Sequence, residues 1–297
     1  MGLALFFSLG AMLSFGIANA VIKTVAERCG AVISIIFRNI IIIILLGAAL
    51  LVIAPKMHSP TWAQLFWAIA LPIGGYFGLL FLLLGLEREK VGIVIPLSSF
   101  RIVIGALVGL LFLGEVVTEM KIISVALVFA GVVLASIDIQ ALRSGLSLGK
   151  GVMFGLLAGT FWGVFMTFFG FPSAVFGALL YALIIEVVTL VAAIAHAYGM
   201  YGRTLFSYTR SVFASLDRRS LIMLGISGVL GASATFFFNL ALETGEYSLT
   251  SAVAGSSVVV SVITGAFLYG ERLTLQQYAA IALVTTGILV PLSAFAL

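Results

Sequence analysis

The sequence predicts an all-α integral membrane protein with ten transmembrane helices, arranged as two inverted five-helix repeats. Three observations support this fold class. Hydrophobic residues make up 63% of the 297-residue chain and charged residues 9%, whereas soluble domains have about 45–50% and about 25%. Apolar runs long enough to span a bilayer, which takes about 20 residues as a helix, recur along the chain. A pattern in the first half also returns in the second.

The repeated pattern rests on acidic residues, which are rare in this chain. Only 11 of 297 residues are Asp or Glu, so matched acids carry more weight than matched apolar residues. A repeat at a fixed offset indicates a duplication, and we expect a first repeat over 1–145 and a second over 146–297. From Gly75 and Gly231 to Gly131 and Gly287, fourteen of fifty-seven positions are identical at an offset of 156 residues. They include Leu86 and Leu242, Glu87 and Glu243, Gly114 and Gly270, Glu115 and Glu271, and Thr118 and Thr274.

Ten apolar runs are the candidate spans. They are too long for the roughly 10-residue strands of a membrane barrel, and they do not alternate polar with apolar residues. Helices satisfy their own backbone hydrogen bonds in lipid. The sharpest break is Gly170-Phe171-Pro172, since Gly and Pro permit a tight turn. In order, the expected helices are Leu3–Ile22, Ala31–Ile53, Trp62–Leu86, Val91–Leu113, Lys121–Ile139, Gly149–Phe169, Pro172–Ala195, Leu221–Leu242, Tyr247–Tyr269 and Leu275–Phe295.

The loops between these spans differ in charge. Thirteen Lys and Arg residues lie between the spans or at their starts. Eleven of them follow odd-numbered spans, and only Lys56 and Lys121 follow even-numbered ones. The positive-inside rule places the basic loops in the cytoplasm, with both termini outside it. Five spans per repeat then invert the second repeat. For the longest connection, Met200–Ser220, we favour a plain amphipathic connector over an interfacial helix that binds anionic lipid.

Glycines recur at four-residue spacing within two of the spans. Small residues let helix backbones approach closely in a membrane, so we expect these rows to be packing surfaces. The alternative is a hinge, because glycine makes a helix less rigid. The longer row consists of Gly151, Gly155, Gly159 and Gly163, and the shorter of Gly105 and Gly109.

Polar residues inside the apolar spans are the functional candidates. A buried charge in lipid costs at least about 2.5–3.5 kcal/mol, so such residues should face the bundle interior or a water-filled cavity. Glu186 is the best proton carrier among them. The structural alternative is an Arg38–Glu186 ion pair that only fixes packing. The candidates for substrate binding or coupling are Arg101, Glu186, Arg38, Asn19, Asn39 and Asn239, with Ser98, Ser99, Ser256 and Ser257 as neutral hydrogen-bonding groups.

Several functional classes find no support in the sequence. Cys29 is the only cysteine, so no internal disulfide can form. His58 and His196 lack metal-ligand spacing, and no metal site or other cofactor is expected. No Walker motif indicates ATP binding, and the basic residues between apolar runs do not indicate nucleic acid. An intramembrane enzyme would need paired acids or a Ser/His arrangement inside the spans, so we do not expect an enzyme.

The starts of the two repeats resemble a known family. The segment Phe15–Lys23 (FGIANAVIK), followed by Phe37-Arg38, resembles the start of an EamA-type repeat of the drug/metabolite transporter superfamily. Phe161-Trp162-Gly163 resembles the start of a second copy, and the two Gly-Glu pairs resemble a recurring element after spans 4 and 9. The second copy has neither a lysine nor an arginine where Lys23 and Arg38 would fall. A family role for those two residues therefore carries over only to the first copy.

The resemblance implies a ten-helix secondary transporter of the cytoplasmic (inner) membrane, with a central cavity between inverted repeats. Members of the family move amino acids, sugars, nucleotide-linked or drug-like molecules, many of them outward. Related transporters often have both termini in the cytoplasm, which disagrees with the distribution of Lys and Arg. We follow the charge distribution.

Together these observations predict a carrier for a small polar organic metabolite, amino-acid-like or otherwise anionic or zwitterionic, that exports its cargo by alternating access. The guanidinium of Arg101 would hold a carboxylate through two parallel hydrogen bonds. A proton or a counter-solute would supply the energy. The protein would be a monomer or homodimer in contact with membrane lipid. One alternative is a proton-coupled sugar uptake permease, and another is a non-transporting membrane scaffold, which would not need central charges.

Overall fold

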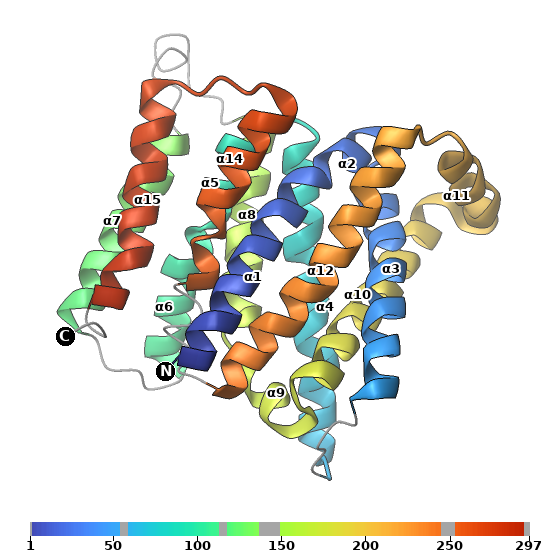
Figure 1. Cartoon of the computed structure of the whole chain (residues 1–297), viewed down its shortest axis with the longest axis horizontal. Coiled ribbons are helices and arrows are strands. Elements are labelled where there is room, and N and C mark those ends of the chain that lie inside the picture. Colours follow the sequence, from blue (N-terminus) through green and yellow to red (C-terminus); the bar gives the residue numbers. More distant parts are fainter. Residues whose placement is uncertain (1, 54–58, 113–117, 137–148, 245–252, 294–297) are drawn as a thin grey trace.

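The computed structural model describes residues 2–53, 59–112, 118–136, 149–244 and 253–293, and the regular structure among them is helical (Figure 1). The first half contains α1 (Gly2–Val21), α2 (Lys23–Cys29), α3 (Ala31–Val52), α4 (Trp62–Leu86), α5 (Val91–Ser98), α6 (Phe100–Phe112) and α7 (Glu119–Ser136). The second half contains α8 (Lys150–Met166), α9 (Gly170–Phe176), α10 (Ala178–Tyr201), the 3-10 turn η2 (Gly202–Thr204), α11 (Leu205–Ala214), α12 (Arg218–Thr244), α14 (Ser257–Tyr269) and α15 (Leu275–Ser293).

Six of the described helical segments are long and apolar enough to cross a membrane. Six uninterrupted or gently bent helical segments qualify, and α8 with α9 forms a seventh if this pair, bent by 49°, is one span. Three shorter apolar helices, at Ile122–Leu134, Val253–Tyr269 and Leu275–Val290, bring the candidates to the predicted ten only if they also cross. The count of ten therefore stays a prediction. Its expected helix ends at Leu113, Ile139, Tyr247 and Phe295 lie outside the described residues.

The two halves of the chain repeat one arrangement in opposite directions. A short helix and a glycine precede a long helix in each half. Gly30 has φ 77° and ψ 157° before α3, and Gly177 has φ 75° and ψ 152° before α10. Figure 1 shows α2 near the top and α9 near the bottom of the bundle. The second repeat is thus inverted relative to the first.

Close contacts between helices follow the same repeat. A Cβ added to Gly16 of α1 would lie 2.9 Å from the Ser257 carbonyl oxygen. A Cβ added to Gly163 of α8 would lie 2.8 Å from the Arg101 carbonyl oxygen. Gly16 and Gly163 match in the repeat starts, and Arg101 and Ser257 match at the offset of 156 residues. The row of glycines on α8 therefore faces α5 and α6, which confirms its predicted role in packing.

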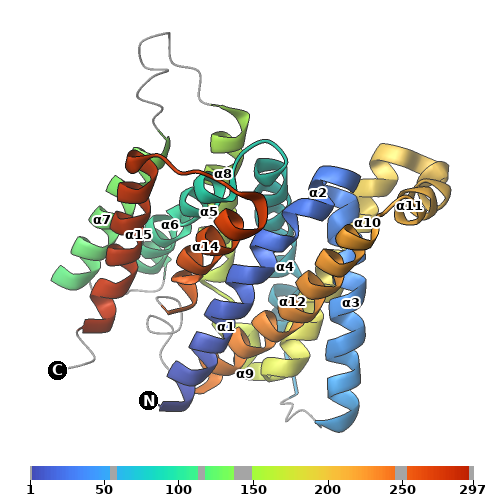
Figure 2. The ribbon, with the colours of Figure 1, turned by 45° about the horizontal axis from the view of Figure 1, so that its top comes forward.

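The repeats exchange their first helices. Helix α1 packs between α12 and α14 of the second repeat, and α8 packs against α4, α5 and α6 of the first (Figure 2). We call α1, α12 and α14 the α1 group, and α4, α5, α6 and α8 the α8 group. Helix α3 packs against α10, and α7 pairs with α15. Each group draws on both repeats, so the repeats are not separate bodies.

The basic residues gather at one end of the bundle, which we call the basic end. It contains α2, α11 and the α4–α5 and α14–α15 connections. Arg28 pairs with Asp217 at 3.1 Å, and the Lys90 Nζ donates to the Arg272 carbonyl oxygen at 3.0 Å. These contacts connect loops that follow odd-numbered spans, as the sequence predicts.

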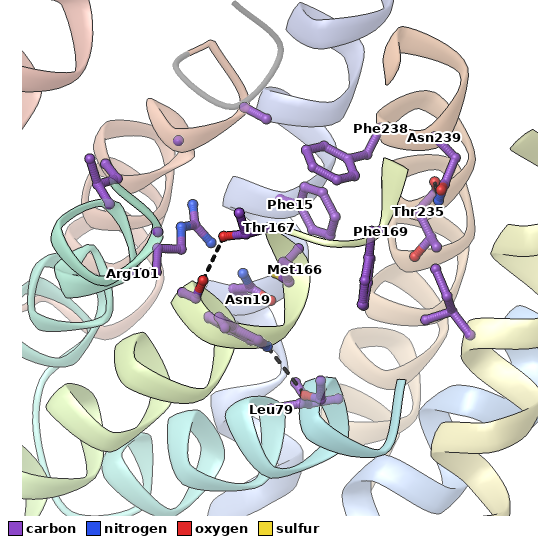
Figure 3. Close-up of a pocket in the computed structure, with 18 of the residues that line it drawn as sticks. Phe15, Asn19, Leu79, Arg101, Met166, Thr167, Phe169, Thr235, Phe238 and Asn239 are labelled. Atoms are coloured by element: carbon purple, nitrogen blue, oxygen red, sulfur yellow. Dashed lines mark hydrogen bonds between the residues drawn. The ribbon is translucent and has the colours of Figure 1, made fainter. Parts of the chain in front are cut away.

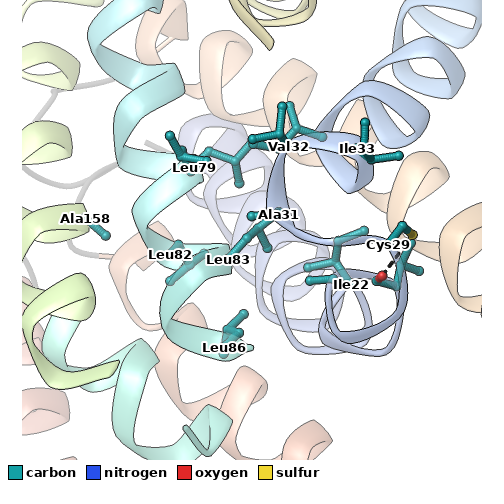
Figure 4. Close-up of a cluster of buried hydrophobic side chains, with 14 of the residues drawn as sticks. Ile22, Cys29, Ala31, Val32, Ile33, Leu79, Leu82, Leu83, Leu86 and Ala158 are labelled. Atoms are coloured by element: carbon teal, nitrogen blue, oxygen red, sulfur yellow. Dashed lines mark hydrogen bonds between the residues drawn. The ribbon is translucent and has the colours of Figure 1, made fainter. Parts of the chain in front are cut away.

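Apolar packing closes the bundle near the basic end. Figure 4 shows Leu82, Leu83 and Leu86 of α4 on the side that faces α2 and its flanking residues Ile22 and Ala31, and all five side chains are buried. On α11, Leu205, Tyr208 and Val212 pack against this cluster. Helix α11 is thus anchored by its apolar face, which supports the connector interpretation of this segment.

The matched acids accept hydrogen bonds from the starts of helices. Ala31 is the first residue of α3, and its N–H donates to the Glu87 carboxylate. Ala178 is the first residue of α10, and its N–H donates to Glu243. Burial nevertheless raises the pKa of Glu87 above its ordinary value. Since the first N–H groups of a helix lack partners within it, these carboxylates stabilise the two helix starts. Gly114 and Glu115 lie outside the described residues.

Candidate substrate cavity

A cavity of about 270 Å³ lies at the centre of the bundle, between the α1 group and the α8 group. Helix α10 and one residue of α3 complete its wall, and α7 and α15 close another side. Five of the polar residues predicted from the sequence line it: Arg38, Arg101, Glu186, Asn19 and Asn239. The inverted repeat therefore brings polar side chains from five different helices to one place.

Glu186 on α10 is held by two neutral donors. The Asn39 Nδ2 donates to Glu186 Oε2 at 2.7 Å and to the Glu186 carbonyl oxygen at 3.2 Å. The Thr235 Oγ1 donates to Glu186 Oε1 at 2.7 Å. Each carboxylate oxygen thus has one donor, and hydrogen bonds to a charged acceptor are stronger than neutral ones. Glu186 is 5% exposed. It lines the cavity, and its hydrogen bonds to Asn39 and Thr235 fix the orientation of its carboxylate.

Thr235 was not among the residues predicted from the sequence. It lies on α12, four residues after Gly231 and four before Asn239, so the three positions share one helix face. The polar Asn239 and the small Gly231 indicate that this face of α12 is turned toward the inside of the bundle. Spacing along α12 could therefore have identified Thr235.

Arg38 on α3 is buried and reaches toward α12. A Cβ added to Gly231 would lie 2.8 Å from an Arg38 guanidinium nitrogen, so the glycine leaves room for this side chain. Within the described ranges, no carboxylate oxygen lies within 4.0 Å of the Arg38 guanidinium. Arg38 and Glu186 attract each other at longer range. The tight ion pair considered from the sequence is therefore not formed in this structure.

Arg101 on α6 contributes a guanidinium to the opposite wall. Its Cζ lies 5.7 Å from the centre of the Trp162 ring, a distance at which the ring face attracts a cation. Figure 3 shows Arg101 across the cavity from Thr235 and Asn239, with Asn19 between them. The cavity thus has a cationic wall at α6 and a wall with a carboxylate and amide at α10 and α12.

Asn239 presents a hydrogen-bond acceptor to the cavity. Its Nδ2 donates to the Thr235 carbonyl oxygen at 2.8 Å, which fixes the orientation of the amide. In the described part of the chain, its Oδ1 is buried and has no partner. A buried acceptor without a donor is unfavourable, so this oxygen is suited to a donor on a molecule inside the cavity.

The remaining predicted residues lie behind the wall. Asn39 hydrogen-bonds to Glu186 and is not among the residues that line the cavity. The four serines, Ser98, Ser99, Ser256 and Ser257, are buried but are not among the residues that line the cavity. Ser98 Oγ donates to the Ile95 carbonyl oxygen at 2.7 Å in its own helix, because a helical serine reaches such a carbonyl readily. This structure does not place the serines where they would touch a cargo.

Much of the wall is apolar and aromatic. Phe15, Trp162, Met166, Phe169 and Phe238 line the cavity, and Phe15 packs edge-on against Phe238 at 6.1 Å. None of them was predicted as a site residue, because apolar residues in a span look alike whether they face lipid or a cavity. Phe15 and Trp162 belong to the two matched repeat starts, and this match is the sequence feature that could have identified them as cavity residues.

Among the described residues, no cluster of three or more His, Cys, Asp and Glu side chains could hold a metal ion. The wall instead offers guanidinium, carboxylate and amide groups beside aromatic rings. Such a surface can bind a charged organic solute, with its apolar part against the rings.

Comparison with known proteins identifies the family. The model of the EamA-like transporter family matches residues 2–137 and again residues 149–292. No curated protein matches the chain. A crystal structure of 13% sequence identity has a TM-score of 0.65, and the match covers 97% of each chain; this similarity supports the fold alone. The two family matches span both repeats, and the chain therefore belongs to the EamA-like transporter family of the drug/metabolite transporter superfamily, as a multi-pass membrane transporter.

Proposed function

We propose that this protein is a secondary active transporter that carries an organic anion or zwitterion across the cytoplasmic membrane through the central cavity. The observation that carries the proposal is Arg101, whose guanidinium lines the cavity beside Trp162. A guanidinium binds a carboxylate or phosphate through two parallel hydrogen bonds. The aromatic wall gives the apolar part of the same solute a surface to pack against.

The charges on the wall favour a cargo with a negative group. Arg38, Arg101 and Glu186 leave one surplus positive charge if all three are ionised. Glu186 already accepts hydrogen bonds from Asn39 and Thr235. An anionic group near Arg101 would balance the wall, and the acceptor on Asn239 would suit a donor such as an ammonium at the other end of a zwitterion.

Alternating access would come from the two mixed groups of helices. We expect ten membrane crossings, with the α1 group rocking against the α8 group around the cavity. Each of these groups contains helices of both repeats, so the moving units are not the repeats themselves. The packing of α1 onto α12 and α14 favours the mixed groups, because tightly packed helices move together.

Energy would come from a proton or a counter-solute, with Glu186 as the proton carrier and export as the direction expected from the family resemblance. A carboxylate held by Asn39 and Thr235 at the cavity wall can exchange a proton with the cavity without moving its helix. The support for this role is the position of Glu186 between those donors and the cavity.

The proposal is tested by Arg101 substitutions. Purified protein is first screened by thermal shift against amino acids and other organic acids, since a ligand that binds only the folded state raises its stability. Flux of each hit is then measured in proteoliposomes. We expect Arg101→Lys to weaken binding and Arg101→Gln to weaken it about tenfold or more, the effect of losing a charged hydrogen bond.

The matched control is Arg210→Gln on α11, which is exposed and remote from the cavity. It should leave ligand stabilisation and flux unchanged. If Arg101→Gln folds and keeps wild-type flux, or if the transported solute is a cation, the proposed cargo class is wrong. If no solute is transported by the wild type and the protein still assembles, the scaffold alternative is favoured.

A further inference from the structure

Lys23 is a buried lysine at the break between α1 and α2, and the cavity does not include it. Its Nζ donates to Glu271 Oε1 at 3.0 Å and to the Glu89 carbonyl oxygen at 2.9 Å. The Lys23 and Glu271 side chains are 10% and 6% exposed. An ion pair so far removed from water is screened little by salt, and losing Lys23 would leave the buried Glu271 without its cation. Lys23 Nζ also lies 4.0 Å from a carboxylate oxygen of Glu27, but the Glu27 side chain is 47% exposed, so Glu271 is the nearer and more buried partner.

Glu271 also binds the start of α5. Its Oε1 accepts from the Val91 N–H at 2.9 Å and its Oε2 accepts from the Gly92 N–H at 3.2 Å. A carboxylate is favourable at a helix start, where N–H groups are unpartnered and the helix dipole is positive. One side chain from the α14–α15 connection therefore ties together α2 and α5.

The bonds from Lys23 to Glu89 and from α5 to Glu271 cross the seam between the α1 group and the α8 group at the basic end. The seam is closely packed: a Cβ added to Gly265 of α14 would lie 2.8 Å from Val91 Cβ. A Cβ added to Gly92 of α5 would lie 2.5 Å from a Leu273 methyl carbon. Opening the cavity at the basic end would separate these surfaces. It would break the bonds of Glu271 to Val91 and Gly92 and the bond of Lys23 to the Glu89 carbonyl oxygen, and the ion pair holds both side chains in place for these bonds.

The second repeat lacks the lysine. Gly163 matches Gly16, and seven residues later Gly170 stands where the first repeat has Lys23. A Cβ added to Gly170 would meet no atom within 4 Å, so a side chain could fit there. In the described part of the opposite end, the position that matches Lys23 therefore carries no charge.

We propose that Lys23 and Glu271 form a one-sided latch that holds the basic end of the cavity closed in the empty protein. The pair stabilises the conformation closed at the basic end, and the second repeat supplies no matching lysine for the opposite closure. The conformational equilibrium is thus biased by one buried ion pair. The proposal does not depend on the identity of the cargo or on the role of Arg101.

The latch is tested by distance measurements without any solute. Spin labels are attached to cysteines at Lys150 of α8 and Leu221 of α12, both exposed, in a Cys29→Ser background in lipid nanodiscs. Glu271→Gln and Lys23→Met should each raise the population with the two labels far apart by about tenfold, which corresponds to about 1.4 kcal/mol. The double variant should show little further change, because the two residues act as one pair.

The matched control is Arg28→Gln. It breaks the Arg28–Asp217 pair, which joins the repeats at the same end but is 53% and 45% exposed, and exposed pairs contribute little. We expect no change in the distance distribution. Folded Glu271→Gln and Lys23→Met proteins with the wild-type distribution would overturn the latch. If neither variant folds, the pair is required for folding, and the proposal of a conformational latch is also wrong.

Discussion

Asn39 and Glu186, 147 residues apart, occupy matching positions of the two repeats and hydrogen-bond to each other at 2.7 Å. Gly30 lies nine residues before Asn39, and Gly177 lies nine residues before Glu186, so these two glycines also occupy matching positions. The two repeats thus meet where one carries an amide and the other a carboxylate. Two carboxylates this close would repel when both are ionised, whereas an amide can donate to the single acid.

We predict that Asn39→Ala destabilises the protein through Glu186. The substitution removes a donor from a buried carboxylate and should cost about 1.5–3 kcal/mol, as for hydrogen bonds to charged groups. The loss should be smaller in a Glu186→Gln background. Thermal unfolding of the two single variants and the double variant measures this coupling.

A control for that cycle is Ser233→Ala, since Ser233 is exposed and bonds to the Val229 carbonyl oxygen of its own helix. It should change stability little in either background. Equal destabilisation by Asn39→Ala with and without the acid would show that Asn39 does not act through Glu186.

A second prediction concerns the glycines before α3 and α10. Gly30→Ala and Gly177→Ala should each destabilise the protein by about 1–3 kcal/mol, because their φ and ψ values lie in a region open almost only to glycine. A steric clash would not cause the destabilisation at Gly30, because an added Cβ there would meet no atom within 4 Å. Thermal unfolding in detergent or nanodiscs is the measurement.

Gly47→Ala in α3 is the matched control. An added Cβ there also meets no atom within 4 Å, but its φ is negative, so alanine should be neutral or stabilise the helix by about 0.5–1 kcal/mol. If all three substitutions had the same effect, backbone conformation would not be the cause.

The repeat could be predicted from the sequence because its markers are polar. Glu87, Glu243 and Glu271 stand out in an apolar chain, and the structure shows that each caps a helix start. The exchange of α1 and α8 between the repeats could not be predicted. An apolar side chain has the same character whether it faces lipid or a neighbouring helix, so the pattern does not reveal which helices pack together.

The site could be predicted only where a charge or an amide marks it. Arg38, Arg101 and Glu186 were recognised because an ion inside a span is costly. Trp162 and Phe238 were not, since aromatic residues are common in spans. The break at Ser99, after Pro96, divides an expected single span into α5 and α6. Beside this break, the Ser98 hydroxyl donates to the Ile95 carbonyl oxygen of its own helix. Backbone geometry of this kind is not visible in composition.

A third prediction concerns the glycine row on α8. Gly159→Leu should impair folding or transport strongly, because an added Cβ would already lie 2.8 Å from the Ser98 carbonyl oxygen and 2.9 Å from Phe100 Cβ. Gly225→Leu on α12 is the matched control, since nothing lies within 4 Å of an added Cβ there. Yield of monodisperse protein and flux are measured for both. Equal tolerance would mean that α8 does not need this close approach.

The last prediction concerns orientation. Helix α3 starts next to α2 at the basic end, so the start of α4 lies at the opposite end (Figure 1). Because Lys and Arg are retained in the cytoplasm, Ser207 on α11 should be cytoplasmic and Ser59, before α4, should lie outside. Cysteines at these exposed positions, in a Cys29→Ser background, are treated with a membrane-impermeant maleimide on whole cells. Labelling at Ser59 alone supports this orientation, with Ser207 labelled only after permeabilisation. The reverse pattern would contradict the charge argument and place both termini in the cytoplasm, as the family resemblance implies.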